Sequence, residues 1–211
     1  SNARLDEDIA LLEKYRPELV ITALGSPQAI VDRVHKWGGK VFADVNSVAF
    51  ARKAVAAGVD GLVLVAAGAG GHTGNMTGFS FVPAVREFFD GPVILGGGIT
   101  NGAGIRAAEV LGAELAYMGT RFIPCVESLA SEAYRAMLVG ATIDDLILTR
   151  AITGVAANWL KPSIANAGFD LATMEDRPDI DFTDPQGGAK RWATVWSAGH
   201  GVGSIDRVET A

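Results

Sequence analysis

Five short apolar segments, each followed by a segment of helical character, constrain the fold more than any other feature of this sequence. Continuous apolar runs are typical of strands that are covered on both faces. Parallel strands need a crossover between them, which a helix usually supplies. The alternation therefore predicts a parallel α/β sheet with strands at 19–25, 40–45, 61–65, 92–95 and 115–118, and with helices at 4–15, 28–37, 47–57, 83–89, 103–111 and 127–139.

The alternation of strands and helices ends near Gly140. The segments that follow lack this rhythm, and we expect residues 141–211 to form a helical cap packed on the preceding region. Residues 1–3 resemble the remnant of a removed affinity tag and are left out of the fold prediction. The predicted organisation is a tag remnant at 1–3, an α/β domain at 4–140 and a C-terminal cap at 141–211.

Composition limits the classes of partner. The chain has 211 residues and a net charge of -6 without a basic stripe, which argues against binding to nucleic acid. No apolar run approaches the roughly 20 residues that span a bilayer, so no membrane partner is expected. The single cysteine, Cys125, cannot form an internal disulfide, which makes the cytoplasm the expected compartment.

Glycine-rich loops follow three of the predicted strands, at 69–74, 96–98 and 119–120. Ligands of parallel α/β domains bind at the carboxyl ends of the strands, so these loops are expected on one rim. A lone histidine after a strand is more often structural than catalytic, but a place on this rim favours a functional role for His72. Backbone amides beside a helix start bind anions, which predicts a phosphate site at Gly97, Gly98, Gly119 and Thr120.

Other residues with reactive side chains are assigned structural roles. The three histidines, His35, His72 and His200, are far apart in the sequence and lack the spacing of metal ligands, so no metal site is expected. His35 lies in a predicted helix and is interpreted as a surface residue. Cys125 is interpreted as a packed thiol and not as a nucleophile.

Several motifs occur together in one order along the chain. They are Ala-Gly-Gly-His-Thr-Gly at 69–74, Val-Ile-Leu-Gly-Gly-Gly-Ile at 93–99, Leu-Gly-Ala at 111–113 and Met-Gly-Thr-Arg-Phe at 118–122. In this combination the chain resembles the nitronate monooxygenases, formerly called 2-nitropropane dioxygenases, and the resemblance continues into 149–154 and 196–203. It implies an FMN-dependent TIM barrel, (β/α)8, that oxidises alkyl nitronates or nitroalkanes with dioxygen.

The resemblance also implies roles for individual residues. His72 matches the catalytic histidine, which abstracts the α-proton of the substrate or contacts its nitro group. Asp44 and Val65 fall where relatives place barrel-lumen residues near the flavin ring, and His200 stands where relatives often have glutamine. The resemblance places Gly70 against the flavin and makes the backbone cradle for its phosphate from Gly97, Gly98, Gly119 and Thr120. Gly71 and Met118 are also expected to bind the cofactor.

The predicted strands match the last five of the eight strands in the family's barrel, and roughly the first third of the barrel has no counterpart. An open set of five strands would expose two parallel edges. We therefore expect a truncated chain or a processed fragment, whose open edge stays exposed or is covered by a partner chain, such as a second copy in a homo-oligomer.

Three functions remain open from the sequence. The first is oxidation of nitronates or nitroalkanes by a flavin enzyme. The second is a flavin-dependent NAD(P)H:quinone reductase or enoyl-acyl-carrier-protein reductase, which resembles the same motifs and would use the histidine as proton donor. The third is an inactive remnant that retains only the phosphate cradle. Bleaching of the flavin by nitronate alone would indicate the oxidation. Rapid bleaching by NAD(P)H would indicate a reductase, and failure to take up FMN would indicate the remnant.

Overall fold

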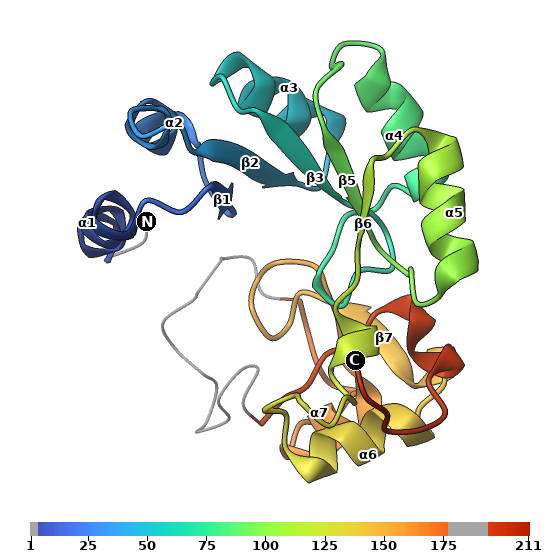
Figure 1. The fold of residues 1–211 in the computed structure, drawn as a ribbon. Helices are drawn as coiled ribbons and strands as arrows, with labels where there is room; N and C mark the ends of the chain where they lie inside the picture. The colour runs from blue at the N-terminus through green and yellow to red at the C-terminus, as the bar shows by residue number, and fades with distance from the viewer. Residues whose placement is uncertain (1–3, 177–193) are drawn as a thin grey trace.

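A five-stranded parallel sheet organises the first two thirds of the protein in a computed structural model that describes residues 4–176 and 194–211 (Figure 1). Its order is β1-β2-β3-β5-β6, and each pairing is parallel. The strands are β1 (Leu19–Thr22), β2 (Lys40–Val45), β3 (Gly61–Val65), β5 (Val93–Gly96) and β6 (Leu115–Tyr117). The predicted parallel α/β sheet is confirmed, and the predicted tag remnant at 1–3 lies outside the described residues.

The helices follow the strands as the alternation predicts. They are α1 (Leu5–Tyr15), α2 (Gln28–His35), α3 (Val48–Ala56), α4 (Gly78–Arg86), α5 (Gly102–Leu111) and α6 (Glu132–Gly140). Side-chain caps fix several starts: Ser47 accepts from the amide of Phe50, and Asn101 accepts from the amide of Gly104. Figure 1 shows α2 to α5 around the outer side of the sheet.

Two helix starts differ from the prediction. Helix α4 begins at Gly78 and carries Pro83 inside it, whereas the sequence suggested a start at the proline. Helix α6 begins at Glu132 instead of residue 127, because the Ser131 hydroxyl accepts a hydrogen bond from the amide of Tyr134 and caps the helix there.

The main core lies between the sheet and the helices. Alternate strand residues such as Ala43, Val45, Leu62 and Leu64 are buried there with Phe81 of α4. The other residues of each strand point to the opposite, concave face of the sheet, because successive side chains of a strand alternate between faces. Phe42, Asp44 and Val63 belong to this concave face.

The five-stranded sheet is open. Strands β1 and β6 form its two edges in the described part of the chain. On the concave face, Leu19 and Ile21 of β1 are 45% and 41% exposed, and Leu115 and Tyr117 of β6 are 60% and 52% exposed. The sheet therefore leaves apolar side chains uncovered at both of its edges.

The C-terminal region contains more β-structure than the predicted helical cap. Strands β7 (Leu146–Thr149) and β8 (Ala157–Leu160) form an antiparallel sheet with β4 (Gly71–His72), in the order β4-β8-β7. The pairing of β4 with β8 joins segments that are far apart in the sequence, so no local pattern indicated it. Helix α7 (Lys161–Asn166) and the 3-10 helices η2 (Ile143–Asp145) and η4 (His200–Ser204) complete the region.

Aromatic contacts hold α6 to the end of the chain. The hydroxyl of Tyr134 donates to the carbonyl of Ser197 at 2.6 Å, and its ring stacks on Trp196 with centroids 4.9 Å apart. Burial raises the pKa of Tyr134, against the effect of this hydrogen bond. In the described residues, no helix is both long and apolar enough to cross a membrane.

Candidate active site

Glycine-rich loops meet at the carboxyl ends of the central strands. The carbonyl of Gly68, after β3, accepts from the amide of Gly98, after β5, at 3.1 Å and from the amide of His200 at 2.9 Å. The amide of Gly199 donates to the hydroxyl of Thr120, after β6, at 2.8 Å. Three strand ends and the C-terminal region are thus joined by hydrogen bonds at one rim, as the sequence predicted for the three loops.

Close packing explains why two of these positions need glycine. A Cβ on Gly70 would lie 2.8 Å from the amide nitrogen of Gly199 and 3.0 Å from the carbonyl carbon of Ala198. Gly97 has a φ of +131°, and a Cβ there would lie 3.0 Å from two carbonyl oxygens of the loop after β3. Gly70 thus packs closely against the C-terminal segment, and its expected place beside a flavin stays a prediction.

His72 is held by a rigid backbone on the same rim. It lies in β4 opposite Ala157, and Gly71 before it lies opposite Asn158. The side chain of Asn158 donates to the carbonyl of Ala69 at 2.8 Å, and the buried hydroxyl of Thr73 donates to the carbonyl of Ala66 at 3.0 Å. The His72 side chain is half-buried, and its Nε2 atom is shielded from solvent. Its position is therefore set by the C-terminal sheet as much as by β3.

The predicted phosphate cradle is available only in part. The amide of Gly98 and the hydroxyl of Thr120 are already used within the protein. Gly119 differs, since a Cβ placed on it meets no atom within 4 Å. The amides of Gly119 and Thr120 precede the 3-10 helix η1 (Thr120–Phe122), and the first amides of a helix have no partner inside it. Space and donors for an anionic group therefore lie at Gly119 and Thr120.

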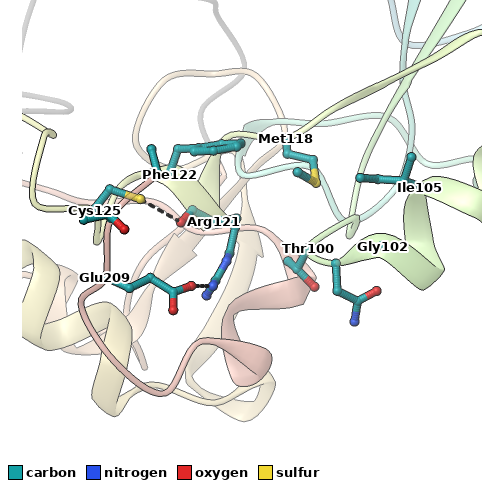
Figure 2. A pocket seen from close by; sticks show the side chains of 11 residues that line it. Thr100, Gly102, Ile105, Met118, Arg121, Phe122, Cys125 and Glu209 are labelled. Carbon is teal, nitrogen blue, oxygen red and sulfur yellow. Dashed lines mark hydrogen bonds and ion pairs between the residues drawn. The ribbon is translucent and has the colours of Figure 1, made fainter.

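A cavity of about 190 Å³ opens between the start of α5 and η1 (Figure 2). Among the residues expected to bind the cofactor, Met118 lines it. Arg121 and Glu209 form an ion pair at its wall, and the Cys125 thiol contacts the carbonyl of Arg121 (Figure 2). Neither Arg121 nor Glu209 was predicted to have a role, although Arg121 lies inside the Met-Gly-Thr-Arg-Phe motif.

Asp44 is a half-buried carboxylate on the concave face. Within the described residues, its Oδ1 atom is shielded from solvent and has no hydrogen-bond partner. Burial raises the pKa of Asp44 from 3.8 to about 6. An ionisable group with a strongly shifted pKa near the ends of strands is typical of functional sites.

The remaining candidates lie outside this rim. Cys125 is buried, at 4% exposed, which confirms the packed thiol. His35 is exposed, and its Nε2 atom lies 2.8 Å from Asp60 Oδ2. That carboxylate also accepts from Lys40 and from the amide of Val41, and these contacts lower the pKa of Asp60 against the opposing effect of its burial. In the part of the chain that the structure describes, no three His, Cys, Asp or Glu side chains are grouped to hold a metal ion.

A curved parallel sheet, with helices outside and loops gathered at the strand ends, is the arrangement of a TIM-barrel protein. Two solved structures share it. FabK from Thermotoga maritima has a TM-score of 0.79 and 27% identity over 99% of this chain and 69% of its own. A nitroalkane oxidase from Streptomyces ansochromogenes has a TM-score of 0.77 and 23% identity over 98% of this chain and 64% of its own, a likeness in fold.

The family follows from the sequence comparison. The nitronate monooxygenase family model matches residues 2–177, and the chain belongs to that family. A nitronate monooxygenase from Paraburkholderia phytofirmans is 33% identical over 177 residues, which are 79% of this chain and 48% of the relative. The chain spans about half the length of the curated relatives it matches.

Proposed function

We propose that this chain carries the catalytic histidine and part of the cofactor site of an FMN-dependent oxidoreductase that acts on alkyl nitronates or nitroalkanes with dioxygen. The single observation that carries the proposal is the convergence of the His72 segment with the glycine loops after β5 and β6 on one rim. Family membership supports the chemistry. The single cysteine supports a cytoplasmic location for the reaction.

The residues at this rim fit a phosphate-bearing flavin. The open space at Gly119 and the amides of Gly119 and Thr120 would take the phosphate. FMN supplies the redox chemistry when it is bound, and the protein supplies position and charge. Gly71, Gly97 and Met118 are proposed to line the same cofactor.

His72 has the task of moving a proton. Its imidazole would take the α-proton of a neutral nitroalkane, or hold the nitro group when the substrate arrives as a nitronate. A general base acts only within hydrogen-bond reach of the proton that it takes. The pairing of β4 with β8 holds the backbone of His72 in place, which suits this task.

Uptake of FMN is the first test. FMN is titrated into the purified chain and followed by flavin fluorescence. The Gly119→Ala variant is expected to weaken FMN binding about tenfold without loss of stability, because a Cβ there enters space that is open in the protein. Gly140→Ala is the matched control, since Gly140 also has no atom within 4 Å of its Cβ position and lies in α6. Equal FMN affinities in the two variants would argue against the cradle.

Flavin reduction separates the enzyme classes. Loss of flavin absorbance on anaerobic addition of a nitronate or nitroalkane, without bleaching by NAD(P)H, is the expected result. Rapid bleaching by NAD(P)H would favour the reductase alternative instead. In the FMN-loaded protein, His72→Ala should abolish turnover of the nitroalkane and leave FMN bound; turnover at the parental level would refute the role of His72.

The open edges of the sheet bear on assembly. We propose that a second copy or another chain covers β1 and β6, where Leu19 and Leu115 are exposed. Analytical ultracentrifugation tests this: a chain that stays monomeric at high concentration would contradict coverage by a second copy.

A further inference from the structure

An ion pair joins the last residues of the chain to the segment after β6. The guanidinium of Arg121 pairs with the carboxylate of Glu209 at the wall of the cavity beside η1 (Figure 2). The two side chains are only 25% and 28% exposed. The second carboxylate oxygen of Glu209 accepts from the Nε atom of Arg207, an exposed residue of the same segment, at 3.1 Å. Partial burial screens the pair with Arg121 less than an ion pair on an open surface, so it can help to hold the two segments together.

Backbone hydrogen bonds fix the position of Glu209 itself. The amide of Val126 donates to the carbonyl of Glu209 at 3.0 Å, and the amide of Glu209 donates to the carbonyl of Pro124 at 3.4 Å. Glu209 thereby forms a parallel bridge with Cys125, which is buried at 4% exposed. The carboxylate that faces η1 therefore extends from a backbone that is held on both sides.

The 3-10 helix η1, which carries Arg121, has little apolar burial to hold it in place. None of its three residues is buried, and Phe122 is 44% exposed. A single turn of 3-10 helix has poor hydrogen-bond geometry and depends on its surroundings for stability. Polar contacts to the C-terminal segment supply this support: the hydroxyl of Thr120 accepts from the amide of Gly199 at 2.8 Å, and Arg121 pairs with Glu209. The position of η1 therefore depends on these contacts.

We infer that Glu209 is a positioning residue for the cofactor site and acts through its ion pair with Arg121. The pair holds η1, and with it the amides of Gly119 and Thr120, which are proposed above to take the phosphate of FMN. The inference rests on the proposed function, whose cofactor site it deepens. Donors that are in place before a ligand arrives bind it more tightly than donors that must first be ordered, so displacement of this loop weakens binding of the phosphate.

The test compares FMN with riboflavin, which has the same ring and ribityl chain but lacks the phosphate. Both are titrated into the parent, Glu209→Gln, Arg121→Met and the double variant, and flavin fluorescence gives the dissociation constants. Glu114→Gln is the matched control, because Glu114 also pairs with an arginine, Arg86, but lies at the amino end of β6, where it accepts from the amide of Val93. Urea unfolding checks that each variant is folded.

Glu209→Gln is expected to weaken binding of FMN about fivefold and binding of riboflavin less than about twofold. In the Arg121→Met background the same change should alter FMN affinity less than about twofold, because Glu209 acts through Arg121. Unchanged or tighter FMN binding in Glu209→Gln overturns the inference, since loss of a carboxylate by charge alone favours an anion. An equal loss for FMN and riboflavin, or the same loss in Glu114→Gln, also overturns it. A parent chain that takes up no FMN overturns the proposed function and the inference with it.

Discussion

Replacing Asp44 by asparagine should change how the stability of the protein depends on pH. Burial raises the pKa of the Asp44 carboxyl from 3.8 to about 6 in the folded state. Between these two values the folded protein binds the proton more often than the unfolded chain. The free energy of unfolding therefore falls as the pH rises through this range, and it stays lower above it.

The size of the effect follows from the difference in pKa. One pKa unit corresponds to about 1.4 kcal/mol, so a fully buried group with this shift would cost about 3 kcal/mol. Asp44 is only half-buried, and solvent screens its charge in part, so we expect about 2 kcal/mol. The asparagine of the variant has no ionisable group, and this contribution is absent from the variant at every pH.

Urea unfolding followed by tryptophan fluorescence measures the effect. The free energy of unfolding is determined for the parent and for Asp44→Asn from about pH 4 to about pH 8. The advantage of the variant over the parent should grow by about 2 kcal/mol across this range, whatever the constant cost of placing an amide there. Subtracting the two proteins cancels carboxyls such as Asp60, which titrate equally in both. Two parallel curves would refute the reasoning, since Asp44 would then titrate alike in the folded and unfolded chains.

Three further changes probe packing and hydrogen bonds, each by the same unfolding assay. Asp60→Asn should lower the free energy of unfolding by about 1–3 kcal/mol at neutral pH, because the carboxylate bonds to Lys40, to His35 and to the amide of Val41. The loss should shrink as acid protonates Asp60 of the parent. Gly70→Ala should destabilise by about 1–3 kcal/mol, because its Cβ would lie 2.8 Å from the amide nitrogen of Gly199; an unchanged midpoint would contradict this close approach. Tyr134→Phe should lose about 1 kcal/mol with the hydrogen bond to Ser197, and full stability would show that water replaces it.

Strands were predictable where a short apolar run stands between turn residues in the sequence. Strands β2 and β3 have the predicted bounds of 40–45 and 61–65, because both are apolar runs between polar or glycine-rich turns. Helix α4 was predicted at 83–89, yet it starts at Gly78 and carries Pro83 inside it. Phe81 and Val82 of this helix are buried, whereas Phe79 is 74% exposed.

The position of the candidate site at the carboxyl ends of the strands was predictable from the sequence. The hydrogen-bond partners of its loops were not. Glycine loops after parallel strands fall at one edge by topology alone, which is why the meeting of the loops at Gly68, Gly98 and Thr120 could be anticipated. Two partners of these loops come from the C-terminal segment, because His200 bonds to Gly68 after β3 and Gly199 bonds to Thr120 after β6, 79 residues earlier. No local pattern specifies such a pairing. The close approach of Gly70 to the backbone of the C-terminal segment could not be predicted for the same reason.

Hydrogen bonds between the C-terminal region and the loops of the parallel sheet help to set the position of His72. A cap that merely rested on a barrel could be removed without moving His72. Here the residue after His72, Thr73, donates its amide to the carbonyl of Ala156, and His72 itself pairs with Ala157 of β8. The amide of His200 bonds to the loop after β3 as well. The backbone position of the proposed general base is thus fixed by contacts from both regions, and we expect the C-terminal region to contribute to the proposed active site.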